Sequence, residues 1–209
     1  MSPKQFSDPN QADQRGSRIL VQGRVQGVGF RPFVYSLALE CGLAGLVRNT
    51  SRGVEIEIHG DSRAADRFLK RLPEEIPPLA RITSLQNEEI EPRTDLSGFT
   101  IEQSAGDEAH SVLISPDIAT CSDCLSEIRN PGDRRHRYPF TNCTNCGPRY
   151  SITRSIPYDR PQTSMACFPM CPTCRKEYNN PLNRRFHAQP NACPDCGPEL
   201  WYTDSNGER

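Results

Sequence analysis

The chain has 209 residues, of which 35% are hydrophobic and 19 are proline, and its formal net charge is −1. This length allows one or two domains, and the low apolar content means that part of the chain needs more than a hydrophobic core to fold. Acidic and basic residues are balanced in both halves, whereas a nucleic-acid-binding module would show a basic excess. No apolar stretch approaches transmembrane length, and residues 1–14 lack the apolar core of a signal peptide. We therefore expect no nucleic acid and no membrane among its partners.

The first half of the chain has the pattern of a compact α+β domain. Residues 1–16 are polar, and we expect a disordered tail there, followed by a domain over residues 17–105. Periodicity and capping residues predict the elements of this domain in chain order: a strand starting at 19, a helix over about 31–41, strands over 43–49 and 54–58, a helix after the N-cap Asp61, and strands over 80–91 and 99–102. This order, read as βαββαβ, predicts a ferredoxin-like sandwich.

A glycine-rich loop joins the first predicted strand to the first predicted helix. Glycines permit unusual backbone angles and close approach to a ligand, and amides at a helix N-terminus favour an anion. Arg31 at the helix start can add a bidentate contact to a phosphate. An ordinary turn without a ligand is the alternative interpretation. The expected phosphate-binding residues are Gly23, Arg24, Val25, Gln26, Gly27, Val28, Gly29 and Phe30.

The sequence of this loop resembles the signature of a known family. Acylphosphatases have a signature that resembles the segment Val21-x-Gly23-x-Val25-Gln26-Gly27-Val28-x-Phe30-Arg31, and the resemblance covers about residues 17–104. It implies that Arg31 and Asn49 are catalytic. Arg31 and the loop amides would offset phosphoryl charge, and Asn49 would hold the attacking water, because a carboxamide both donates and accepts hydrogen bonds. The alternatives are a surface arginine at a helix start and a turn asparagine.

The second half of the chain is rich in Pro, Asn, Arg and Cys and shows little periodicity. We expect a linker over residues 106–116 and a small irregular domain over 117–209. Eight of the ten cysteines form one spacing pattern written twice, with each member of the second set fifty residues after its counterpart in the first. The two sets are Cys121, Cys124, Cys143 and Cys146, then Cys171, Cys174, Cys193 and Cys196.

The spacing of these cysteines favours metal ligation over disulfides. Two residues between thiols let one turn aim both sulfurs at one ion, and a second pair completes a four-sulfur shell. We expect two structural Zn²⁺ ions in sequential fingers over 121–146 and 171–196, with metal binding supplying folding free energy. Iron as the metal and interleaved pairing of the cysteines are the alternatives. Such thiols indicate a reducing compartment, the cytoplasm.

Several other side chains in this pattern have structural expectations. Cys41 and Cys167 are expected to be packed thiols rather than ligands. His136 and His187 lie in arginine-rich turns, where a solvated role is expected and contact with an anionic ligand is the alternative. A small core around the metals is expected from Tyr138, Phe140, Phe186 and Trp201.

The finger sequences also resemble a known family. Residues 138–150 and 184–198, together with Asp159-Arg160-Pro161 between them, resemble the paired zinc fingers of HypF-type carbamoyltransferases, which act in nickel–iron hydrogenase maturation. The segment Gly29-Phe30-Arg31-Pro32-Phe33 resembles the N-terminal domain of the same family. The two signatures follow one another in the family's order and cover about residues 17–200.

The resemblance implies a substrate, a cofactor and a partner. Carbamoyl phosphate would be cleaved to carbamate and phosphate, and the carbamoyl group would pass in an ATP-dependent step to the C-terminal cysteine of a HypE-type partner to make the cyanide ligand of the hydrogenase iron. ATP would bind only through domains expected beyond residue 209, so we expect this chain to bind or hydrolyse the acyl phosphate without completing transfer.

Two other functions stay open on the sequence. One is a generic acylphosphatase with an accessory zinc module, which would turn over different acyl phosphates equally. The other is a non-enzymatic zinc-ribbon module that docks protein or RNA, although the balanced charge of the second half argues against RNA.

Overall fold

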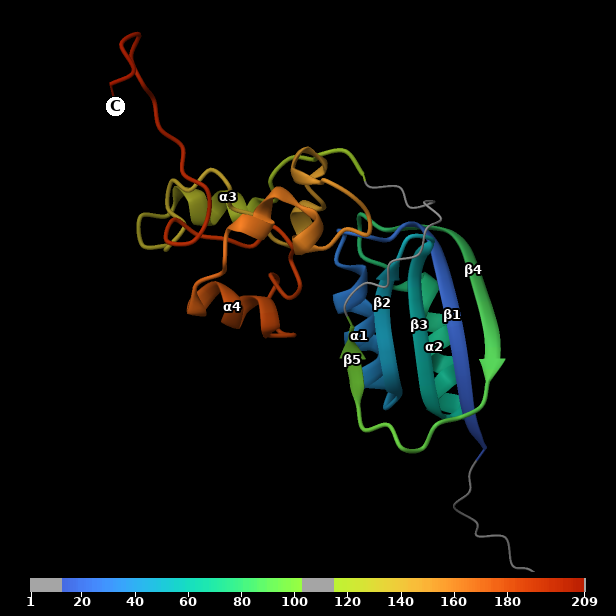
Figure 1. Cartoon of the computed structure of the whole chain (residues 1–209). Coiled ribbons are helices and arrows are strands. Elements are labelled where there is room, and N and C mark those ends of the chain that lie inside the picture. Colours follow the sequence, from blue (N-terminus) through green and yellow to red (C-terminus); the bar gives the residue numbers. More distant parts are fainter. Residues whose placement is uncertain (1–12, 103–114, 209) are drawn as a thin grey trace, which may run out of the picture.

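The computed structural model of the chain describes residues 13–102 and 115–208. Residues 13–102 form a sheet with two helices on one face, and residues 115–208, called the finger region here, lie beside the part of this sandwich that carries helix α1 and strand β5 (Figure 1). The expected linker over 106–116 falls almost wholly outside the described residues. Among the described residues, no helix is long and apolar enough to cross a membrane.

The sheet has five strands in the order β4-β1-β3-β2-β5. Neighbouring strands are antiparallel except β2 and β5, which pair in parallel. The strands are β1 (Gln14–Arg24), β2 (Ala44–Thr50), β3 (Gly53–Asp61), β4 (Arg81–Ile90) and β5 (Phe99–Ile101), and the helices are α1 (Phe30–Cys41) and α2 (Ser62–Glu74). The βαββαβ order confirms the predicted ferredoxin-like sandwich, and β5 extends it by one short edge strand.

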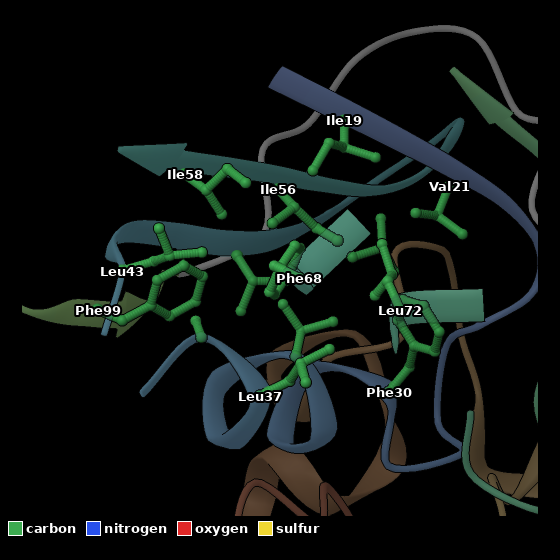
Figure 2. Packing of buried hydrophobic residues seen from close by; sticks show 14 of the residues in the cluster. Ile19, Val21, Phe30, Leu37, Leu43, Ile56, Ile58, Phe68, Leu72 and Phe99 are labelled. Carbon is green, nitrogen blue, oxygen red and sulfur yellow. The ribbon is translucent and has the colours of Figure 1, made fainter. Parts of the chain in front are cut away.

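Apolar side chains from the sheet and from both helices fill one layer. Ile56 of β3 and Leu37 of α1 meet in this layer, with Phe68 of α2 beside them (Figure 2). The alternation in β3 and the helical spacing in α1 therefore bury the faces that the sequence predicted. Cys41 belongs to the same cluster, so its predicted structural role is confirmed.

Local residues fix where both helices begin. The Asp61 side chain accepts hydrogen bonds from the amides of Arg63 and Ala64 at 3.0 and 3.1 Å, which confirms the predicted N-cap of α2. Helix α1 lies between Gly29 and Gly42, whose φ angles are 77° and 74°. These left-handed caps suit glycine and hold the preceding loop at a fixed angle to the helix.

The boundary of the expected N-terminal tail is wrong. Strand β1 begins at Gln14, which pairs with Asp61. Gly16 lies between β3 and β4, where a Cβ atom would come within 2.7 Å of the Ile90 carbonyl oxygen. Polar residues can begin the strand because main-chain hydrogen bonds to β3 hold it from Gln14 on, and β4 joins as a second neighbour at Gly16. Residues 1–12 lie outside the described part of the chain.

The finger region contains two helices that the sequence did not predict. Each of these helices follows the first cysteine of a set, which occupies its N-cap position. They are too short to show an apolar period, which is why sequence patterning misses them. The helices are α3 (Ser122–Arg129) and α4 (Pro172–Asn179), accompanied by short 3₁₀ turns at Thr144–Cys146, Tyr150–Ile152, Arg160–Gln162 and Ser164–Cys167.

The expected aromatic core around the cysteines is only half right. Tyr138 and Phe186 are buried, and Phe186 packs against Tyr35 of α1 with ring centroids 5.4 Å apart. Phe140 and Trp201 are 40% and 52% exposed. The thiols themselves occupy the centre of each finger, so few aromatic side chains are needed there.

Candidate phosphate site and cysteine clusters

The glycine-rich loop has the backbone that the sequence predicted. Gly27 and Gly29 adopt left-handed φ angles of 70° and 77°, and the loop leads directly into helix α1. The first amides of a helix have no acceptor within the helix, so they face whatever lies before its N-terminus. The loop therefore presents main-chain N–H groups at a positive helix end, which suits an anion.

Side chains of the loop mainly hold it in place. Val25, Val28 and Phe30 are buried in the core of the sandwich. Arg24 donates from Nε to the carbonyl oxygen of Leu79 at 2.7 Å, so its guanidinium is engaged away from the expected phosphate position. Any contact of these residues with a phosphate would thus come from the backbone.

Gln26 ties the loop to two other parts of the molecule. Its Nε2 donates to the carbonyl oxygens of Thr50 and Gly53 at 2.8 and 3.0 Å, at the turn between β2 and β3. Its Oε1 accepts from the amide of Tyr158, in the finger region, at 3.0 Å. Because Gln26 is fully buried, these bonds are shielded from water, and they fix the finger region against the loop.

Arg31 is paired with a carboxylate from the finger region. The side chain is 8% exposed, and its Nη2 donates to Oδ1 of Asp159 at 2.6 Å. This is a charge-assisted hydrogen bond with little competition from water. The guanidinium expected to bind phosphate therefore already holds an anionic group.

Asn49, at the end of β2, faces the same part of the finger region. It is fully buried, and its Nδ2 donates to the carbonyl oxygen of Tyr158 at 3.4 Å. Its Oδ1 is buried without a hydrogen-bond partner among the described residues. An unpaired buried oxygen costs about 1–3 kcal/mol, so such an atom in a native site is suited to a water or a ligand.

The finger region covers the loop closely. A Cβ atom at Gly27 would lie 2.5 Å from Cβ of Pro148, and one at Gly29 would lie 3.3 Å from Cβ of Thr144. Between loop and cover, the cavity that Arg31 and Tyr158 help to line measures only ≈ 20 Å³, roughly enough for one water. Arg31 also lines a larger neighbouring cavity of ≈ 430 Å³.

His187 lies in the wall of both cavities, close to Arg31 and Asp159. Its ring packs against Tyr178 and Phe186, with centroids 4.8 and 4.7 Å apart. Burial, together with the Arg31 charge, lowers the pKa of His187 to about 4. His187 is half-buried, so the expected solvated role holds only in part, and the ring is neutral near pH 7. His136, in the corresponding turn of the first finger, is half-buried.

The eight cysteines gather in the sequential grouping. Cys121, Cys124, Cys143 and Cys146 form one cluster, Cys171, Cys174, Cys193 and Cys196 form the other, and the sulfur atoms in each lie within 4.8 Å of one another. Individual Sγ–Sγ separations run from 3.6 to 3.9 Å. A tetrahedron with metal–sulfur bonds of about 2.3 Å has sulfur–sulfur edges of about 3.8 Å, so both clusters fit a metal ion.

Cys167 stands apart from both clusters. It is exposed, and its Sγ donates to the carbonyl oxygen of Ser164 at 3.1 Å. The prediction of a packed thiol is wrong, because the short turn at Ser164–Cys167 buries Met165 and leaves the Cys167 side chain exposed.

Two residues at the candidate site were not predicted from the sequence: Asp159 was named only as part of a motif, and Tyr158 was not named at all. Tyr158 and Asp159 contact the loop, Asn49 and Arg31 from a segment more than a hundred residues away in the chain. The only sequence signal in this segment was the resemblance of Asp159-Arg160-Pro161 to the HypF-type family.

Comparisons with known proteins agree with this two-part arrangement. The family model Acylphosphatase matches residues 17–101, and the model HypF finger matches residues 120–153 and 170–203. An acylphosphatase of Staphylococcus aureus is 40% identical over 85 residues, which are 41% of this chain and 96% of that protein.

Longer relatives match both parts together. The carbamoyltransferase HypF2 of Cupriavidus necator is 53% identical over 153 residues, which are 73% of this chain and 19% of that protein. A crystal structure of full-length HypF in the phosphate- and nucleotide-bound form matches with a TM-score of 0.86 and 47% identity, over 92% of this chain and 25% of that one. The chain thus spans about a fifth of the length of the curated carbamoyltransferases that it matches. The chain therefore belongs to the acylphosphatase family over residues 17–101, carries two HypF fingers after this domain, and over both parts is similar to the carbamoyltransferases HypF.

Proposed function

We propose that this chain binds and hydrolyses an acyl phosphate, carbamoyl phosphate, as the N-terminal part of a hydrogenase-maturation carbamoyltransferase. The observation that carries the proposal is the convergence of Arg31 and Asn49. They come from α1 and β2, yet they contact consecutive residues, Asp159 and Tyr158, beside the glycine-rich loop.

The chemistry needs no covalent nucleophile from the protein. Loop amides and the Arg31 guanidinium would hold the phosphoryl oxygens and offset their charge. Oδ1 of Asn49, which has no hydrogen-bond partner in the described part of the chain, would accept a hydrogen bond from the attacking water. A new bond forms between phosphorus and the water oxygen. The bond from phosphorus to the acyl oxygen breaks, and carbamate leaves with its electron pair while the water proton passes to solvent.

Substrate binding requires the cover to open at the loop. A phosphoryl group does not fit a cavity of ≈ 20 Å³, so Tyr158, which lines this cavity, would move away from the loop when the phosphoryl group enters. The Asp159 carboxylate and the phosphate are both anions that would bind the same guanidinium. Asp159 therefore competes with the substrate for Arg31.

The metal and the later steps complete the proposal. The two cysteine clusters would each hold Zn²⁺, which would stabilise the finger region without taking part in the reaction, because four sulfurs close the shell. Unpaired cysteines of this kind suit the cytoplasm. Transfer of the carbamoyl group to a HypE-type partner, with ATP, is the activity of the whole protein that we propose these residues feed.

A hydrolysis assay tests this proposal. Phosphate release from carbamoyl phosphate should fall by about 10²–10³ in Arg31→Ala and by a similar factor in Asn49→Ala, because each removes a group that acts on the transition state. Arg18→Ala is the matched control, since Arg18 lies on the exposed side of β1, and it should keep full activity.

Two results would contradict the proposal. Equal turnover of acetyl, benzoyl and carbamoyl phosphates would favour a generic acylphosphatase. A folded, metal-loaded chain that neither binds nor hydrolyses carbamoyl phosphate would favour a binding module.

A further inference from the structure

The fifty-residue repeat in the sequence is also a repeat of contacts in space. Each finger carries two consecutive arginines between its two cysteine pairs, Arg134–Arg135 in the first and Arg184–Arg185 in the second. These are called the arginine pairs here. Each pair points away from the cysteines of its own finger and contacts those of the other finger.

The arginine pair of the first finger contacts the second cluster. Nη2 of Arg134 lies 3.1 Å from Sγ of Cys174. Arg135 is almost fully buried and forms a two-pronged ion pair with Glu177 of α4, at 3.0 and 2.6 Å. Its Nε also donates to the carbonyl oxygen of Ala192, the residue before Cys193, at 2.9 Å.

The arginine pair of the second finger makes the same contacts in reverse. Nη1 of Arg184 lies 2.9 Å from Sγ of Cys124. Arg185 is buried and forms a two-pronged ion pair with Glu127 of α3. Its Nε donates to the carbonyl oxygen of Asn142, the residue before Cys143, at 3.0 Å. Every partner differs by fifty residues from its counterpart in the other finger, as in a two-fold interface between identical units.

Charge explains why such an exchange matters. Four thiolates and one divalent ion carry a net charge of −2, and burying that charge without cationic partners is costly. Hydrogen bonds from outside the ligand shell that stabilise ligand charge typically change metal affinity by about 10–100-fold.

We propose that the arginine pairs couple the two metal sites, so that each finger supplies the positive charge that holds the metal of the other. The loop that carries an arginine pair is itself positioned by the cysteines on either side of it. Metal bound in one finger therefore orders the arginine N–H donors that contact the second site. Loss of either metal lowers the affinity of the other site for its metal. The proposal concerns metal affinity and does not depend on hydrolysis at the phosphate site.

Site-resolved metal release tests the coupling in the full chain. The chain is loaded with Co²⁺, whose four-thiolate absorption reports occupancy, and is then exposed to a chelator and to iodoacetamide. Peptide mass spectrometry follows alkylation at Cys121–Cys124 and at Cys171–Cys174 separately. Arg134→Ala should speed alkylation of the second cluster by about 10-fold or more, and more than that of the first. Arg184→Ala should show the mirror-image result.

Two further variants complete the test. Arg129→Ala removes an equal charge from an exposed position in α3 and should leave both release rates unchanged. Cys124→Ser disables the first site and should speed metal loss from the second by about 10-fold. Arg134 is half-exposed, so its replacement should not prevent folding, and circular dichroism checks this. The proposal would be overturned if Arg134→Ala released metal first from its own finger. It would also be overturned if Cys124→Ser left the rate of metal release from the second site unchanged.

Discussion

Replacing Gly27 by alanine should measure how firmly the finger region sits on the loop. The new Cβ would lie 2.5 Å from Cβ of Pro148 and 3.0 Å from ring carbons of Tyr158. The left-handed φ of 70° adds about 1–2 kcal/mol of backbone cost. Overpacking of this kind costs a further 1–3 kcal/mol, roughly. We expect a total loss of about 2–5 kcal/mol in the free energy of unfolding.

Gly42→Ala isolates the backbone part of that loss. Gly42 has a similar φ of 74°, but a Cβ there meets no atom within 4 Å. It should therefore cost only about 1–2 kcal/mol. Urea unfolding of the metal-loaded chain, followed by circular dichroism, gives both values. The excess for Gly27→Ala should vanish when a chelator removes the metal, because the finger region then no longer presents Pro148 and Tyr158 to the loop.

Equal losses for the two variants in the metal-loaded chain would refute this reasoning. The finger region would then not rest on the loop in solution, and the Arg31–Asp159 contact would lose its structural support. A larger loss in the free energy of unfolding for Gly42→Ala than for Gly27→Ala would lead to the same conclusion.

Two further predictions concern the neighbourhood of Arg31. Asp159→Asn keeps the shape but removes the competing charge, so inorganic phosphate should bind about 10-fold more tightly by calorimetry; unchanged or weaker binding would show that Asp159 does not compete. His187 has a pKa of about 4 in the folded chain against an ordinary 6.5, so the unfolded state binds more protons between these values and stability falls as pH drops through this window. Unfolding at pH 7 and pH 5 should show a loss of about 2 kcal/mol that His187→Gln abolishes; a variant with the same pH dependence would contradict it.

Sequence reasoning succeeded where the physical cause is local. The alternation of Val54, Ile56 and Ile58 buries one face of β3, and Asp61 caps the helix that follows it. The C-x₂-C pairs likewise predicted two four-sulfur clusters, since two thiols three positions apart can meet within a single turn. The eight-residue helices α3 and α4 escaped prediction because their stability comes from buried cysteines and not from an apolar stripe.

The amino-acid pattern was enough to predict the sandwich, the glycine-rich loop and the sulfur clusters, because each depends on neighbouring residues or on a short period. The contacts between the two parts of the chain became known only from the three-dimensional structure. It placed Asp159 on Arg31 and Tyr158 over Asn49, and it crossed the arginine pairs between the fingers. These contacts join segments from about 40 to nearly 130 residues apart, and no local pattern encodes them, since they arise when buried charges and amides find partners as the two parts of the chain pack together.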